Sequence, residues 1–269
     1  TLGPPLSLPH VCRRATHLTS SAHCTNPLTP NLSRRRQWGE CDDNVYTTVQ
    51  NGANVIIWFA TNLASDEDGN AAITGGPNRD CVVEKINTLE SMGFGRDKVK
   101  HLISIGGWDA AHPDTTHTAE EYFTAWESFS DGLYDGLDWD LEGNDNLQSE
   151  WNYFSKPCLE LMADFSKLIH DAGYIVSLVP PESYLDVQTT EFSRYVNLTF
   201  PGELWPGENS TNQFSYHGHN SYAYPLAKYP DAFDMVSVQI YETKSHAAYN
   251  TSVLGVDQVE YMKGYINRL

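Results

Sequence analysis

Residues 134–143 read YDGLDWDLEG, and acidic and apolar side chains alternate strictly over the second half of this stretch. Asp138, Asp140 and Glu142 are separated by one tryptophan and one leucine. A period of two is typical of a β-strand, in which successive side chains point to opposite faces. We therefore predict a strand that carries a row of acids on one face, at a spacing of about 6.6 to 7 Å. The tryptophan and the leucine would pack on the other face.

Such a row of acids points to proton chemistry. Like charges this close cannot all ionise freely, so we expect at least one proton to be retained, as a general acid near neutral pH requires. A solvated edge strand is one alternative, although the apolar residues between the acids demand burial. A calcium or magnesium site is another, since oxygen ligands suit these cations, but such sites usually take their ligands from a bent loop. A binding protein that keeps the motif without the chemistry is a third.

Three segments carry a resemblance to a known family. Residues 135–142 resemble the D-G-x-D-x-D-x-E signature of family 18 glycoside hydrolases, the chitinases and endo-β-N-acetylglucosaminidases. Residues 104–108, SIGGW, are similar to the S-x-G-G motif on the third barrel strand of the family. Residues 239–241, QIY, are similar to the Q-x-Y at the end of its sixth strand. The resemblance extends over roughly residues 36–269 and implies a (β/α)8 barrel.

The resemblance implies hydrolysis of a β-1,4 bond beside N-acetylglucosamine in chitin or chitooligosaccharides, with the 2-acetamido oxygen of the substrate as nucleophile and no cofactor. Glu142 would protonate the leaving oxygen and later activate water. Asp140 would accept a hydrogen bond from the acetamido N–H and stabilise the oxazolinium intermediate. Asp138 would lie behind Asp140 and share a proton with it. Tyr241 would donate its hydroxyl to the acetamido carbonyl oxygen. An endo-β-N-acetylglucosaminidase and a catalytically inert, lectin-like barrel remain as alternatives.

A second set of residues is expected to bind substrate, and it comprises Trp58, Ser104, Gly106, Gly107 and Gln239. The serine and the glycines would keep the barrel mouth open by being small. Trp58 would line the sugar site or fill the layer that faces the helices, and we favour the layer. Asp135 has the opposite parity to the other acids, so we expect it to end a turn or cap a helix.

Composition limits the class of partner. The net charge of −18 argues against nucleic acid or an anionic membrane surface, whereas a neutral sugar polymer is compatible with it. The sequence has no run of about 18 apolar residues that would span a membrane. Five scattered cysteines without a C-x-x-C pair indicate neither a zinc site nor a disulfide framework. The compartment stays open, although the family resemblance favours secretion.

The order of the elements predicts the architecture. Residues 1–36 read as a disordered or foreign basic leader, and residues 37–269 read as the barrel. Helices are expected at 43–50, 78–92, 118–129, 152–172 and 256–268, and strands at 53–60, 99–106, 174–179 and 234–241 besides the acidic one. Strands that alternate with helices imply a parallel α/β sheet with the acids at its carboxyl edge. About six of the eight units of a family barrel are present, so we expect an incomplete barrel. An open doubly wound sheet is the runner-up, but no G-x-G-x-x-G follows the first strand.

Overall fold

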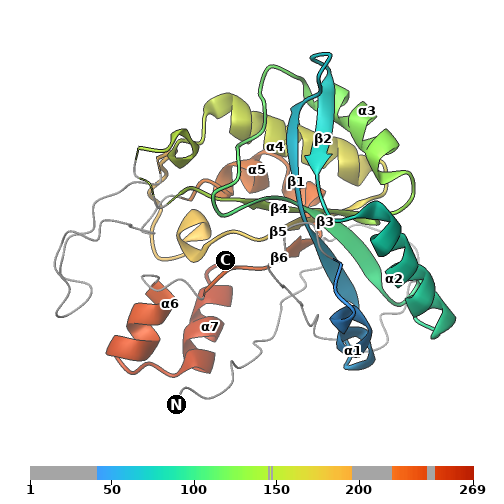
Figure 1. Ribbon diagram of the computed structural model, residues 1–269. Helices are drawn as coiled ribbons and strands as arrows, with labels where there is room; N and C mark the ends of the chain where they lie inside the picture. The colour runs from blue at the N-terminus through green and yellow to red at the C-terminus, as the bar shows by residue number, and fades with distance from the viewer. Residues whose placement is uncertain (1–40, 145, 147, 196–219, 241–245) are drawn as a thin grey trace.

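The computed structural model describes residues 41–144, 146, 148–195, 220–240 and 246–269, so the predicted leader lies outside the described residues. The described part forms one six-stranded sheet in the order β2-β1-β3-β4-β5-β6, with helices around it (Figure 1). Its strands are β1 (Val55–Ser65), β2 (Ala71–Gly75), β3 (Lys100–Gly107), β4 (Gly136–Leu141), β5 (Ile175–Leu178) and β6 (Met235–Val236). Its helices are α1 (Asn44–Gln50), α2 (Arg79–Ser91), α3 (Ala119–Ser130), α4 (Lys156–Asp171), α5 (Ala223–Lys228), α6 (His246–Ala248) and α7 (Gln258–Ile266).

The connections are those of a parallel α/β fold. β1, β3, β4, β5 and β6 pair in parallel as neighbours, and only β2 pairs antiparallel, with β1. A helix follows most strands, as the alternating pattern predicts. The sheet does not close, because among the described residues β2 and β6 form its two ends. The expected α/β architecture with an incomplete barrel is confirmed.

The outer face of the sheet holds the main hydrophobic core. Alternate side chains of β1, β3 and β4 join a cluster with α1, α2, α3 and α4. Trp139 of β4 is fully buried there, with its ring 6.1 Å from that of Phe165. Its indole N–H donates to Ser166 Oγ at 2.8 Å. The apolar face predicted for the acidic strand is therefore confirmed, and each such buried side chain contributes about 1.5 to 3 kcal/mol to stability.

The inner face is apolar at the amino ends of the strands and polar at their carboxyl ends. Val55, Ile57 and Leu102 form a small second cluster, against which Ile175 and Met235 pack. Leu102 pairs with Gly136 in the register of β3 and β4, and Ser104 pairs with Asp138 two positions further on. The polar residues thus begin one layer above the apolar base, at the edge where parallel sheets usually carry their sites.

Most predicted elements have slightly different bounds in the structure, and the larger differences concern β1, α4 and β6. β1 continues to Ser65 and forms a hairpin with β2, which the sequence reading missed. The helix expected from residue 152 begins at Lys156, because Ser155 caps it by accepting from the Cys158 N–H at 3.1 Å. A separate 3₁₀ turn, η1, occupies Glu150–Asn152. The helix over 118–129 has the expected start, with a complete capping box between Thr118 and Glu121.

The strand expected over 234–241 is only two residues long as β6. Pro180 and Pro181 follow β5 after Val179, and because proline has no amide hydrogen the ladder cannot continue regularly beside them. The chain still follows β5, since the Gln239 N–H donates to the Pro180 carbonyl at 2.8 Å. An isolated bridge between Pro181 and Gln239 marks the same continuation.

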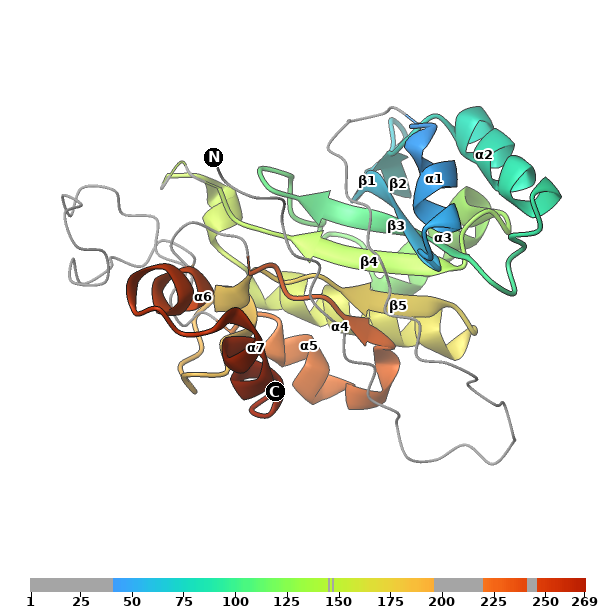
Figure 2. The same ribbon diagram turned by 90° about the horizontal axis from the view of Figure 1, so that it is seen from below.

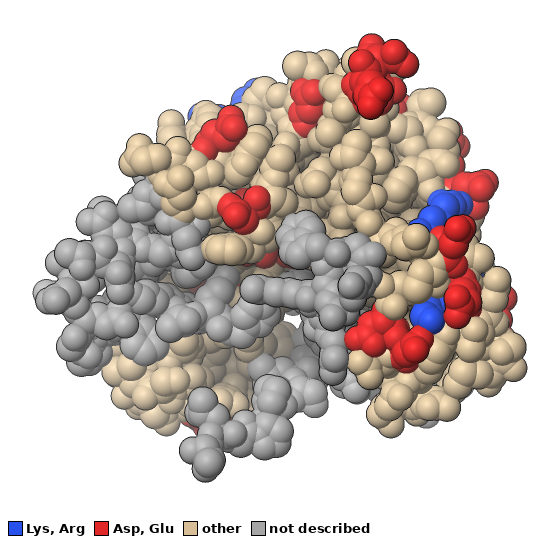
Figure 3. Space-filling model, in the orientation of Figure 1, with Lys and Arg blue, Asp and Glu red and all other residues tan. Residues whose placement is uncertain are grey.

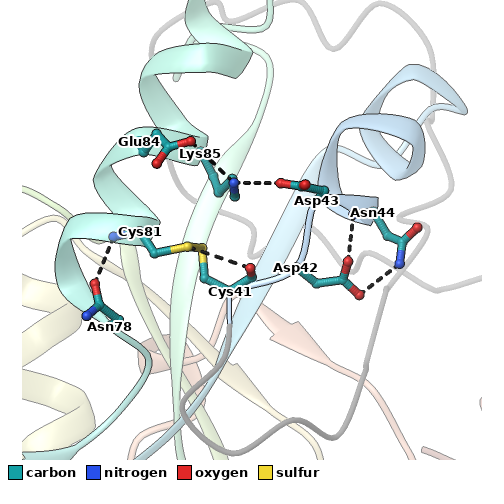
Figure 4. The surroundings of a disulfide bond; sticks show 8 residues. All are labelled: Cys41, Asp42, Asp43, Asn44, Asn78, Cys81, Glu84 and Lys85. Carbon is teal, nitrogen blue, oxygen red and sulfur yellow. Dashed lines mark hydrogen bonds and ion pairs between the residues drawn. A yellow bond between two sulfur atoms is a disulfide. The ribbon is translucent and has the colours of Figure 1, made fainter.

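A disulfide joins Cys41 to Cys81, and the expectation that the cysteines form no such framework is wrong for this pair (Figure 4). The two residues are 40 positions apart in sequence, and the packing of α1 against α2 brings their Cα atoms to 5.9 Å. Beside them Lys85 Nζ lies 2.6 Å from Asp43 Oδ1, and this hydrogen bond raises the pKa of the lysine above its usual value. Cysteine spacing alone could not reveal a pair that only tertiary packing creates.

The outside of the molecule agrees with the acidic composition. Figure 3 shows acidic side chains gathered along the side formed by α1 and α2. Figure 2 shows α6 and α7 at the opposite side of the sheet from these helices. No helix among the described residues is long and apolar enough to cross a membrane.

Candidate active site

Burial of the acids decreases toward the carboxyl end of β4. Asp138 is fully buried, Asp140 is 2% exposed, and Glu142, one residue beyond the strand, is half-buried. The parity predicted from sequence therefore holds for the strand, because its acids are on the face opposite Trp139. Glu142 is the member of the row that a molecule at the strand ends can reach.

Gln239 brings the two outer acids together. Its side-chain amide nitrogen lies 2.8 Å from Asp140 Oδ1 and 3.1 Å from Glu142 Oε1. The same nitrogen lies 2.8 Å from the carbonyl oxygen of Val179, which fixes the amide at the end of β5. A neutral donor between two carboxylates lets them stay close without an ion pair. Gln239, which was expected to bind substrate, thus contacts the acidic row.

The S-x-G-G segment lies beside the acids on β3. Ser104 Oγ donates to Asp138 Oδ2 at 3.4 Å, so this serine contacts the innermost acid. Gly106 has a φ of +101°, and a Cβ there would lie 2.8 Å from the backbone oxygen of Asp140. Gly107 has a φ of +125°, and a Cβ there would lie 2.6 Å from the Phe59 ring. The glycines are therefore needed for the close approach of β3 to its neighbours, which keeps the strand end free of side chains.

Trp58 does not belong to this site. It is buried in the hydrophobic cluster on the outer face, and its indole nitrogen donates to His101 Nδ1 at 3.3 Å. Trp58 points to the face of β1 opposite the acids. The structure therefore does not support a substrate-binding role for it, and our preferred expectation, that it fills the layer facing the helices, is confirmed. Asp135 also lies away from the site, where its carboxylate accepts from the His101 N–H at 2.9 Å and from Arg96 at 3.3 Å.

Tyr241, the expected donor to the acetamido group, lies outside the described residues. A different tyrosine contacts the acidic strand. The Tyr222 hydroxyl donates to the Leu141 carbonyl at 3.0 Å, and burial, together with the negative charges of Asp140, Glu142 and Asp138, raises its pKa well above the usual value. It therefore stays a donor. Sequence reasoning missed it because it lies in a stretch without regular pattern, and nothing in its local sequence sets it apart.

No group of three or more His, Cys, Asp or Glu among the described residues is arranged to hold a metal ion. The acids lie along a strand, so their carboxylates point in parallel toward one space and do not surround a point. The arrangement offers one partly exposed carboxyl group, that of Glu142, with two buried acids behind it, and such a set suits proton transfer.

No protein-family model and no curated protein matches the sequence, but solved structures resemble the fold. A GH18 chitinase from Pseudoalteromonas aurantia is 17% identical with a TM-score of 0.44, over 71% of this chain and 61% of that one. A family 18 chitinase from Crocus vernus is 11% identical with a TM-score of 0.46, over 80% and 66%. A chitinase from Aspergillus fumigatus is 19% identical with a TM-score of 0.46, over 78% and 66%. This chain thus spans 61% to 66% of the length of these solved chains, less than two thirds. The first two belong by name to the family that the three sequence motifs resemble.

Proposed function

We propose that this chain is part of the catalytic domain of a family 18 glycosidase, which hydrolyses β-1,4 bonds at N-acetylglucosamine in chitin or chitooligosaccharides. The observation that carries the proposal is the pair formed by Asp140 and Glu142 on one amide of Gln239, with only the outer acid open to solvent. That arrangement gives one accessible proton donor and one buried charge behind it. The motif resemblance gives the same two residues the same two roles.

In the proposed reaction Glu142 protonates the glycosidic oxygen as the bond breaks, and then takes a proton from the attacking water. Asp140 accepts a hydrogen bond from the acetamido N–H and balances the positive charge that develops on the oxazolinium ring. Asp138, fully buried and bonded to Ser104, sets the charge of Asp140 by sharing a proton with it. Tyr241 would donate to the acetamido carbonyl oxygen.

The direction of the acids favours the substrate as its own nucleophile. A protein nucleophile attacks from the sugar face opposite the leaving group, and its carboxyl group usually lies about 5 to 5.5 Å from that of the acid, across the bond. Asp140 lies on β4 and Glu142 lies one residue beyond it, and both contact the same amide, so both approach from one side. A substrate with a free amino group at the sugar before the cleaved bond should therefore resist hydrolysis. Efficient cleavage at such a sugar, or inversion at the anomeric carbon, would exclude this mechanism.

The central test is the variant Glu142→Gln, which keeps the shape of the side chain and removes the proton donor. We expect turnover of chitooligosaccharides to fall by at least about a hundredfold while oligosaccharide binding, measured by calorimetry, survives. Glu150→Gln is the matched control, because Glu150 is exposed on η1, in the connection after the same strand. Equal turnover in Glu142→Gln and the parent protein would rule out the assignment.

Two other functions share the named residues. An endo-β-N-acetylglucosaminidase would cleave a high-mannose glycopeptide in preference to chitooligosaccharides, so both substrates belong in the assay. A lectin-like barrel would bind one of them and cleave neither. The acids, Ser104 and Gln239 are all present, which favours catalysis over binding alone. The Cys41–Cys81 disulfide is typical of proteins that fold in an oxidising compartment, in keeping with a secreted glycosidase.

A further inference from the structure

The strand that carries the acids ends just before the residue proposed to do the chemistry. The ladder between β3 and β4 stops at the pair Gly107 and Leu141, and the ladder between β4 and β5 stops at Trp139 and Leu178. From Glu142 onward the backbone must find other partners, since buried N–H and C=O groups are costly to leave unpaired. The position of Glu142 therefore depends on contacts outside the sheet.

His112 supplies the first of these contacts. With its proton on Nε2, the imidazole donates to the carbonyl oxygen of Glu142, 3.0 Å away. The ring lies against Phe154 and Trp151, with centroid distances of 4.3 and 5.6 Å. Burial lowers the pKa of His112, while hydrogen bonds to the backbone of Glu142 and Tyr153 oppose the shift. The imidazole is thus held in place as a neutral donor from the loop that follows β3.

Tyr184 and Asn152 supply the next two contacts. The Tyr184 hydroxyl accepts from the Gly143 N–H at 2.8 Å, and Asn152 Oδ1 accepts from the Asn144 N–H at 2.7 Å. Tyr184 is 1% exposed and Asn152 is 4% exposed, so neither bond competes freely with water. Three successive backbone positions, beginning with that of Glu142, are each bonded to one buried side chain. His112 follows β3, Asn152 follows β4 and Tyr184 follows β5.

We infer that His112, Asn152 and Tyr184, together the acid cradle, are positioning residues for the proton transfer by Glu142. Each of them bonds to the backbone at or just after Glu142, so we expect them to act through the position of that backbone. The inference rests on the proposed function. A general acid works only when its oxygen is within hydrogen-bond reach of the leaving oxygen, and a displacement of about 1 Å can cost orders of magnitude in rate.

The test uses the dependence of the rate on the leaving group. Tyr184→Phe keeps the ring and removes the acceptor, and His112→Phe removes the donor. Each should lower kcat/KM on chitotetraose by about tenfold, the usual effect of one lost hydrogen bond. On 2,4-dinitrophenyl chitobioside, whose leaving group departs without a proton, the loss should be less than about twofold. His112→Gln, which restores an amide donor near the Nε2 position, should recover most of the activity.

Tyr122→Phe is the matched control. Tyr122 is fully buried like Tyr184, and its hydroxyl bonds to a backbone group away from the acids, the Asp114 carbonyl at 2.8 Å. It should lower the thermal unfolding midpoint to a similar degree and leave kcat/KM on both substrates unchanged. A loss of equal size on the two substrates, or the same loss in Tyr122→Phe, would overturn the positioning role and leave the proposed function standing. A parent protein that cleaves neither substrate would overturn both.

Discussion

His101 should make the folded protein sensitive to acid. It is 1% exposed on β3, where its Nδ1 accepts the indole N–H of Trp58, and this bond requires a neutral imidazole at that nitrogen. Burial lowers its pKa from 6.5 to about 4. The positive charges of Arg96 and Lys100 lower the pKa as well, and the negative charge of Asp135 opposes this shift. At about 1.4 kcal/mol for each tenfold change, the neutral form is favoured in the folded state by about 3 kcal/mol.

The direction of the change in stability with pH follows from the number of protons that each state binds. Between pH 6.5 and pH 4 the unfolded chain binds a proton at His101 that the folded protein does not, so stability falls as pH falls through this window. The contribution of the neutral His101 to the free energy of unfolding is complete above pH 6.5 and is lost below pH 4. From pH 8 to pH 5 the loss should be about 2 kcal/mol.

Urea unfolding at both pH values measures this difference. His101→Asn cannot titrate but keeps an acceptor near the Nδ1 position, so the variant should lose about 2 kcal/mol less than the parent on going from pH 8 to pH 5. His170→Asn is the control, because His170 is partly exposed at the end of α4. Other buried imidazoles, such as His112, are common to parent and variants and cancel in the comparison. An unchanged pH dependence in His101→Asn would refute the reasoning.

Three further outcomes are expected. Replacing both Cys41 and Cys81 by serine should lower the free energy of unfolding by about 4 kcal/mol, because the closed loop of 40 residues is released in the unfolded chain; an unchanged urea midpoint would contradict this. Gly136→Ala should prevent folding, since its Cβ would lie 1.9 Å from a carbonyl oxygen of β5, while Gly264→Ala, whose Cβ would meet only an arginine tip at 3.4 Å, should fold normally by circular dichroism. Asp140→Asn should weaken inhibition by an uncharged thiazoline mimic of the oxazolinium by at least about tenfold, and equal inhibition constants would argue against a charged role for this carboxylate.

The sequence determined the acidic strand and the class of fold. The β-strand is the regular structure in which side chains alternate between faces with a period of two. The alternation of polar and apolar residues therefore predicted that Asp138 and Trp139 lie on opposite faces. Strands between helices restrict the topology to parallel pairing with right-handed crossovers, and this placed the acids at the carboxyl edge. Ser104, Gly106 and Gln239 were expected to bind substrate because of the motif resemblance, and the structure places all three beside β4.

Tertiary structure alone decided the contacts between distant segments. The Cys41–Cys81 disulfide, the bond of the Tyr222 hydroxyl to β4, and the bonds of His112 and Tyr184 in the acid cradle each join residues that are tens of positions apart. No local period of the sequence predicts such contacts. Trp58 shows the same limit, because an indole suits both a sugar site and a core, and only the pairing of β1 with β3 assigns its face. The local pattern predicts which way a side chain points on its own strand. Its contacts depend on which strands and loops the folded sheet brings together.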